Sequence, residues 1–204
     1  MSRKTDRTIK MCVDRVLQDD RVIPAAEAAL RENAVNEPLP RPGGTTASFR
    51  LRMAIETRKM WKPGRTLNIR FLGGLTPVRN KVAAIARGWM QHANVRLNFG
   101  SAADAEIRIA FLEGQGSWSA VGTDALERAY FPLSEPTMNF GWLDEDTADD
   151  EYERVVLHEF GTRSGASMST RVPAPIFRGM RKRSINTSAD RPTTGIGRIP
   201  TRTF

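Results

Sequence analysis

The feature that most limits what this chain can fold into is an abrupt change of composition after Gly161. Of the 43 residues from Thr162 to Phe204, 20 are Ser, Thr, Gly or Pro, and nine Lys or Arg stand against one acidic residue. The whole formal net charge of +8 therefore lies in this segment, and residues 1–161 are neutral. Sparse apolar residues without a period cannot bury enough surface to form a core. We therefore expect a disordered basic tail over 162–204 and a folded core before it.

Residues 1–44 are predicted to form an accessory N-terminal segment. Pro24 to Asn33 is compatible with a short helix that has Pro in its first turn. Pro38 to Gly44, with the sequence PLPRPGG, has the composition of a linker. An unstructured leader and a segment packed on the rest of the protein are both compatible with this pattern.

Residues 45–161 carry the periodic patterns of an α+β domain, with a small twisted mixed sheet and two long helices. Alternation predicts strands, and 3.6-residue spacing predicts helices. The expected elements are a helix over 45–60, a strand over 66–72, a helix over 76–92, strands over 95–99 and 106–112, a loop over 113–123, a short strand over 136–143 and a helix over 147–161.

Composition narrows the class of protein. Hydrophobic residues make up 40% and charged residues 26% of the chain, which is typical of globular proteins. We find no apolar run of about 18 residues and no signal peptide. The single Cys12 cannot form an internal disulfide. Together these features favour a protein without a membrane span and a cytoplasmic location.

The most suggestive chemical motif is His158-Glu159 on the last predicted helix. In zinc peptidases the pattern is H-E-x-x-H, because residues four apart share one helix face and the Glu lies beside the metal. An extended form, H-E-x-x-H-x-x-G-x-x-H, adds a third His after a turn. His158, Glu159 and Gly165 match that extended form, whereas Thr162 and Met168 stand where the second and third His belong.

Several segments together resemble the catalytic domain of bacterial metzincins related to astacins and matrixins. In chain order they are KMWKPGRTLNIRFLGG, ARGWMQHANVRLNF, DAEIRIAF, GSWSAVGTDA, PTMNFGW and VVLHEFG, and they cover about half of the chain, from Lys59 to Gly161. The resemblance implies the fold of a metzincin upper subdomain. It also implies a zinc-dependent endopeptidase that acts on peptides or proteins.

The resemblance assigns roles to two residues. His158 would be the first zinc ligand, and Glu159 the general base that takes a proton from water and passes it to the leaving amine. The PTMNFGW segment, Pro136 to Trp142, would be the edge strand that aligns an extended substrate. A lower subdomain would normally follow the third His, so without it we expect the apolar side of the 147–161 helix to be partly uncovered.

One imidazole should hold zinc far more weakly than three. The chain has two histidines, and His92 is expected at the surface or the core edge. We therefore predict that this chain neither binds zinc tightly nor cleaves casein. A second strong nitrogen or sulfur donor beside the His158 ring would overturn that prediction.

The residues after Gly161 are compatible with the missing ligands in another reading frame. If one nucleotide is restored before the Thr162 codon, the codons that Thr162 to Pro173 allow can encode H-A-L-G-G-I-H-E-H-Q-S-P. This string completes the zinc-binding pattern at the correct spacing. We therefore expect that 162–204 is an out-of-frame translation, which the coding DNA would test.

Two alternatives stay open. The first is a non-catalytic binding protein whose tail, with Arg181, Lys182 and Arg183 as its densest cluster, contacts nucleic acid or an anionic surface. The tail has only Phe177 and Phe204 as aromatic residues, so stacking on single strands is disfavoured and no specific nucleic acid is predicted. The second is an unrelated α+β domain with a coincidental His-Glu pair.

Overall fold

A computed structural model describes residues 10–38 and 57–163, with side chains up to Gly161. The chain divides into two units, Met1–Arg171 and Val172–Phe204, and every described residue belongs to the first. The predicted tail lies outside the described residues, as does most of the predicted 45–60 helix. Residues 57–60, which are described, are not helical.

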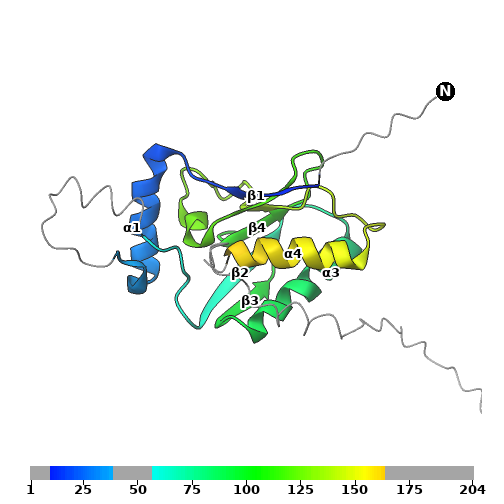
Figure 1. The fold of residues 1–204 in the computed structure, drawn as a ribbon, viewed down its shortest axis with the longest axis horizontal. Coiled ribbons are helices and arrows are strands. Elements are labelled where there is room, and N and C mark those ends of the chain that lie inside the picture. Colours follow the sequence, from blue (N-terminus) through cyan, green and yellow to red (C-terminus); the bar gives the residue numbers. More distant parts are fainter. Residues whose placement is uncertain (1–9, 39–56, 164–204) are drawn as a thin grey trace, which may run out of the picture. The chain divides into compact units, whose positions relative to one another are not determined.

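A mixed six-stranded sheet forms the centre of this unit (Figure 1). Its order is β1-β5-β6-β4-β2-β3. Strands β2, β3, β4 and β6 pair in parallel, β5 runs antiparallel to β6, and β1 pairs in parallel with β5. The strand bounds are β1 Cys12–Arg15, β2 Arg65–Phe71, β3 Val95–Phe99, β4 Ile107–Ala110, β5 Ser117–Ala120 and β6 Met138–Asn139.

Two long helices follow the sequence periodicity closely. Helix α3, Thr76–Ala86, has Pro77 in its first turn and continues as a short 3-10 helix, Arg87–Gln91. Helix α4, Asp149–Arg163, opens with three acidic residues, which suit the positive end of a helix dipole. Neither of these helices, nor any other in 10–38 and 57–163, has the length and apolarity that a membrane crossing requires.

The core lies between the sheet and these helices. Leu67 and Ile69 of β2 are buried on the alternate positions that the strand pattern predicts. All four residues of β4 are buried, because β2 and β6 flank that strand. The predicted class, α+β with a small mixed sheet and two long helices, is confirmed.

The N-terminal segment is packed on the domain. It contains β1, a short 3-10 helix Asp19–Arg21, helix α1 (Val22–Glu32) and a 3-10 turn, Ala34–Asn36. Ala25 and Ala29 of α1 are buried, and α1 contacts the 3-10 helix Gly122–Leu126. Between the two possibilities that the sequence left open for residues 1–44, the described part, 10–38, shows the packed one.

Two strands differ from the sequence prediction. Residues 113–123 were expected to be a loop, but Ser117–Ala120 within them form β5. The β1 strand was not predicted, because CVDR is too short to show alternation and most of it is exposed. Its partner β5 lies more than 100 residues further along the chain, so the pairing is purely tertiary.

Candidate metal centre

Helix α4 carries the predicted His158-Glu159 pair into the middle of the domain. Glu159 is fully buried and His158 is half-buried. The neighbours Val155, Val156 and Phe160 are buried too and fix the rotation of the helix. Burial of a carboxylate is expensive unless it has charged or hydrogen-bonding partners, so the fully buried Glu159 marks this place as a candidate site.

Strand β1 brings a third residue to this pair. The parallel register aligns Cys12 with Ser117 and Asp14 with Ser119. Ser119 Oγ donates a hydrogen bond of 3.3 Å to the Glu159 backbone carbonyl, so this side of β5 faces α4. Because Cys12 lies on the same side of the sheet, its thiol meets the His158-Glu159 pair.

The donor atoms of Cys12, His158 and Glu159 all lie within 4.8 Å of one another. Donors bound to a single zinc ion lie roughly 3.5 Å apart, given bond lengths of about 2.0–2.3 Å. A small adjustment of side chains therefore allows the three to meet on one ion. Sulfur and imidazole nitrogen are the donors that zinc prefers, and a carboxylate oxygen is also accepted. The residues present fit a zinc ion.

The electrostatics of Cys12 depend on two charged neighbours. Burial, followed by the negative charge and hydrogen bond of Glu159, raises the pKa of the Cys12 thiol to about 12, while Arg154 acts in the opposite direction. Arg154 is itself held by Glu151, with Nε to Oε2 at 2.9 Å and Nη2 to Oε1 at 2.8 Å. The thiol is therefore protonated at neutral pH, and its S–H donates a hydrogen bond to the Glu159 carboxylate.

Packing also positions α4 along its axis. Trp89 Nε1 donates a hydrogen bond of 3.2 Å to the Leu157 carbonyl. A Cβ on Gly161 would lie 3.1 Å from the Trp89 ring, so a residue without a side chain suits this close approach. These contacts hold the C-terminal half of α4 where His158 and Glu159 reach the sheet.

The exposed apolar helix side that the sequence predicted is absent among the described residues of α4. Tyr152, Val155, Val156, Leu157 and Phe160 are all buried. Helix α3, β5 and β1 contact α4, and the contribution of β1 was not foreseen. This correction has a simple cause: an N-terminal strand covers a surface that the sequence argument left open.

The predicted edge strand is also corrected. Residues 136–142 do contain a short strand, β6, but β6 lies between β5 and β4 in the sheet interior. The strand next to the metal candidates is β5, and β1 occupies its outer side. Asn139 of β6 instead holds the loop before β5 in place. Its Nδ2 donates hydrogen bonds to the carbonyls of Gly116, at 2.7 Å, and Leu112, at 3.2 Å.

The other residues named by the sequence argument do not join the cluster. His92 is exposed at the end of the 3-10 helix Arg87–Gln91. The side chain of Thr162 and all of Met168 lie outside the described residues. Cys12 is the functional candidate that sequence reasoning missed. Its signal was faint, since a thiol 146 positions before His158 has no motif spacing.

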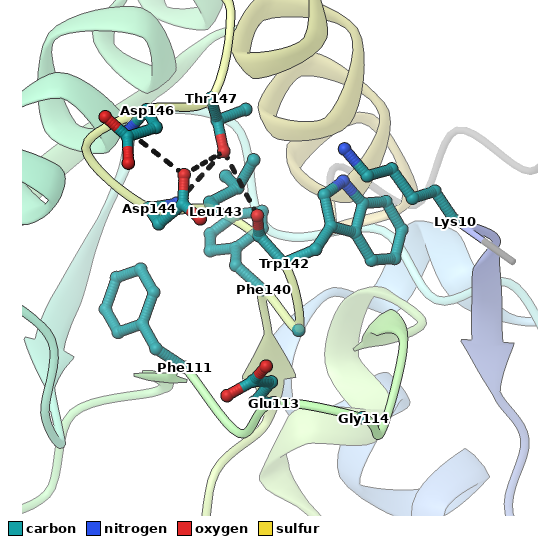
Figure 2. Close-up of a pocket in the computed structure, with 11 residues that line it drawn as sticks. Lys10, Phe111, Glu113, Gly114, Phe140, Trp142, Leu143, Asp144, Asp146 and Thr147 are labelled. Carbon is teal, nitrogen blue, oxygen red and sulfur yellow. Dashed lines mark hydrogen bonds between the residues drawn. The ribbon is translucent and has the colours of Figure 1, made fainter. Parts of the chain in front are cut away.

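A pocket of about 530 Å³ opens near the N-terminal end of β1 (Figure 2). Phe111, Asp144 and Asp146 lie on one side of it, and Trp142 and Lys10 on the other (Figure 2). A compact loop supports the acidic side, with Thr147 Oγ1 donating 2.6 Å to Asp144 Oδ1 and 3.1 Å to the Trp142 carbonyl.

No family model and no curated protein matches the chain. Two solved structures of myroilysin, a bacterial metallopeptidase, resemble it. One is 41% identical with a TM-score of 0.50, over 52% of this chain and 50% of that one. The other is 31% identical with a TM-score of 0.50, over 74% of this chain and 57% of that one. The chain thus spans little more than half of the structures it matches, and its fold is metallopeptidase-like.

Proposed function

We propose that this chain is a metzincin-type zinc metallopeptidase domain in a closed form that does not cleave peptides. The observation that carries the proposal is the cluster of Cys12, His158 and Glu159 on a metallopeptidase-like fold. The fold similarity supports the class of enzyme. The cluster supports the position of the metal, because it combines donors that zinc prefers with a buried carboxylate.

In this proposal His158 and Cys12 hold the metal, and Glu159 lies beside it. When bound, zinc supplies Lewis-acid chemistry to the scissile carbonyl and acidifies water. With zinc bound, Glu159 would be the group that accepts the proton, and its burial on helix α4 would hold its carboxylate beside the metal. The thiol must lose its proton when it binds a metal, and the nearby Arg154 favours that loss.

Two features support the absence of cleavage. The sequence contains only His92 and His158, so three imidazoles cannot meet on one ion. In addition, β1 is paired along β5, which is where an extended peptide would form its backbone hydrogen bonds. Cys12 is the second strong donor that the sequence argument named as the finding that would overturn its prediction. The expectation of weak zinc binding is therefore withdrawn, and the absence of cleavage now depends on these two features. Zinc binding gains a second strong donor, while the cleft stays covered.

The proposal also explains why the second and third zinc-binding histidines are missing. We infer that residues 162–204 are translated out of frame, because the charge and composition change at one position and the codons that these residues allow can encode both absent histidines in the restored frame. The coding DNA decides this point. If one restored base before the Thr162 codon does not produce two His codons at the required spacing, the frame proposal is wrong.

Metal content is the direct test of the centre. The purified full chain, dialysed against zinc, should retain zinc that is lost in Cys12→Ser and in His158→Ala but kept in the control His92→Ala. It should not cleave casein. Equal zinc retention in all four proteins would contradict the metal centre. A chelator-sensitive casein activity of the unaltered chain that disappears in Glu159→Gln would contradict the proposed inactivity.

A further inference from the structure

The pocket that Lys10 lines has the chemistry of a site for a basic side chain. Three carboxylates line it, from Glu113, Asp144 and Asp146, and Lys10 is the only basic residue among its lining residues. Phe111, Phe140 and Trp142 supply apolar walls. Aromatic walls suit the aliphatic stem of a Lys or Arg, and carboxylates at the rim suit its charged end.

The pocket lies in line with the peptide cleft of the proposed function. Lys10 precedes β1 and is two residues from Cys12. In an extended chain, residues two apart project to the same side at a separation of about 7 Å. Because Lys10 also lines the pocket, the pocket lies beside the N-terminal end of β1, next to the metal candidate Cys12.

The positive charge of Lys10 acts on two acidic groups near this pocket, Asp144 and Glu151. The pKa of Asp144 is lowered, chiefly by the hydrogen bond from Thr147, and the positive charge of Lys10 adds to the lowering. The pKa of Glu151 is lowered chiefly by Arg154, with a contribution from Trp142 and another from Lys10. Trp142 Nε1 donates 2.9 Å to Glu151 Oε1, which joins this carboxylate to the pocket wall.

We propose that this pocket is a subsite that selects a Lys or Arg side chain of a peptide that replaces β1 along β5. The inference rests on the proposed function, because it requires that β5 accept a peptide strand. It adds the class of peptide that the cleft binds: peptides with a basic residue two positions before the one at the metal centre. In the closed chain, Lys10 lines the side of the pocket opposite Asp144 and Asp146 (Figure 2).

Binding of peptides to a full-length Lys10→Glu variant tests the subsite. The added negative charge should push β1 away from the carboxylates, and faster alkylation of Cys12 by iodoacetamide would report its release. Fluorescent peptides with the sequence of residues 9–17, Ser in place of Cys, and Lys, Met or Glu at the position of Lys10 are then compared by fluorescence anisotropy. The Lys peptide should bind about fivefold more tightly than the Met peptide, and the Glu peptide most weakly.

Matched variants locate the preference. Glu113→Gln with Asp146→Asn, added to Lys10→Glu, removes two pocket carboxylates and should bring the Lys and Met peptides to equal affinity. Glu145→Gln removes a carboxylate from the same loop but not from the pocket wall, and should leave the preference unchanged. The preference should also weaken as salt is raised.

The outcomes that contradict the subsite differ from those that contradict the peptide-binding cleft of the proposed function. Equal binding of all three peptides overturns the subsite but leaves a peptide-binding cleft in place. No binding of any peptide, although Cys12 has become reactive, overturns both the subsite and the cleft. An unchanged rate of Cys12 alkylation in Lys10→Glu overturns the subsite, since the pocket then does not discriminate charge. A preference that survives removal of Glu113 and Asp146 carboxylates shows that another surface selects the lysine.

Discussion

At the scale of single residues, the reactivity of Cys12 depends on the charged side chains next to its thiol, Glu159 and Arg154. An isolated thiol has a pKa near 8.5, whereas burial and Glu159 bring that of Cys12 to about 12. Thiolate is the form that reacts and binds metal, so a raised pKa makes the Cys12 thiol less reactive at neutral pH. Arg154 and Glu159 act on the same thiol with opposite signs.

These opposite signs give a prediction for Cys12 reactivity. Glu159→Gln should speed alkylation by iodoacetamide at pH 8, because loss of the negative charge lowers the thiol pKa and raises the thiolate fraction. Arg154→Ala should slow the alkylation, because loss of the positive charge raises the thiol pKa and lowers the thiolate fraction. The rate, followed by mass spectrometry from pH 7 to 10, should shift to lower pH in the first variant and to higher pH in the second.

Glu153→Gln is the matched control for that measurement. It removes a charge from the same helix but is not among the groups that shift the Cys12 pKa. Its alkylation profile should overlay that of the unaltered chain. If all three variants react alike, the thiol is controlled by opening of β1 and not by its two charged neighbours.

At the scale of elements, the N-terminal segment is joined to the domain through Asn36. This side chain is fully buried. Its Nδ2 donates 2.9 Å to the Ala29 carbonyl and 2.9 Å to the Met60 carbonyl, and its Oδ1 accepts 3.0 Å from Met60 N. One amide therefore links the end of α1 to the segment that precedes β2, across a stretch of sequence that includes the predicted linker.

Replacing this amide should weaken the whole unit. Asn36→Ala removes three hydrogen bonds and leaves the half-buried Met60 backbone N–H and carbonyl without this side-chain partner, and we expect the free energy of unfolding in urea to fall by about 2 kcal/mol. Val35→Ala, at an exposed neighbouring position, should change it by less than about 0.5 kcal/mol. Equal stability of both variants would mean that the N-terminal segment is not energetically coupled to the domain.

At the scale of the whole molecule, charge and core are separated along the chain. The apolar side of α4 is covered by α3, β5 and β1, all of which precede it. The positive charge lies after it. Net charge governs solubility and non-specific association more than it governs fold. Removal of the basic segment after Arg163 should therefore change the charge of the protein without changing its stability.

A chain that ends at Arg163 should keep its fold. Its formal net charge falls from +8 to +1, so isoelectric focusing should show a much lower pI. The urea unfolding midpoint should stay close to that of the full chain, and the rate of Cys12 alkylation should not change. A large loss of stability would show that residues after 163 contribute to the core.

Much of the fold could be predicted because its signals are local. The 3.6-residue spacing of Val78, Val82 and Ala86 marks α3, and the alternation of Leu67 and Ile69 marks β2. The His158-Glu159 pair was identified from adjacent letters on one helix. By contrast, β5 was assigned to a loop because Gly114, Gly116 and Gly122 flank a four-residue strand, and short strands carry little periodic signal.

The sequence by itself determined helices α3 and α4 and strands β2, β3 and β4, and that His158 and Glu159 share one turn of a helix, because those properties depend on residues a few positions apart. Only the tertiary structure decided that Cys12 lies beside them and that Lys10 lines an acidic pocket. Both follow from the pairing of β1 with β5, a contact between segments more than 100 residues apart, which no spacing along the chain encodes.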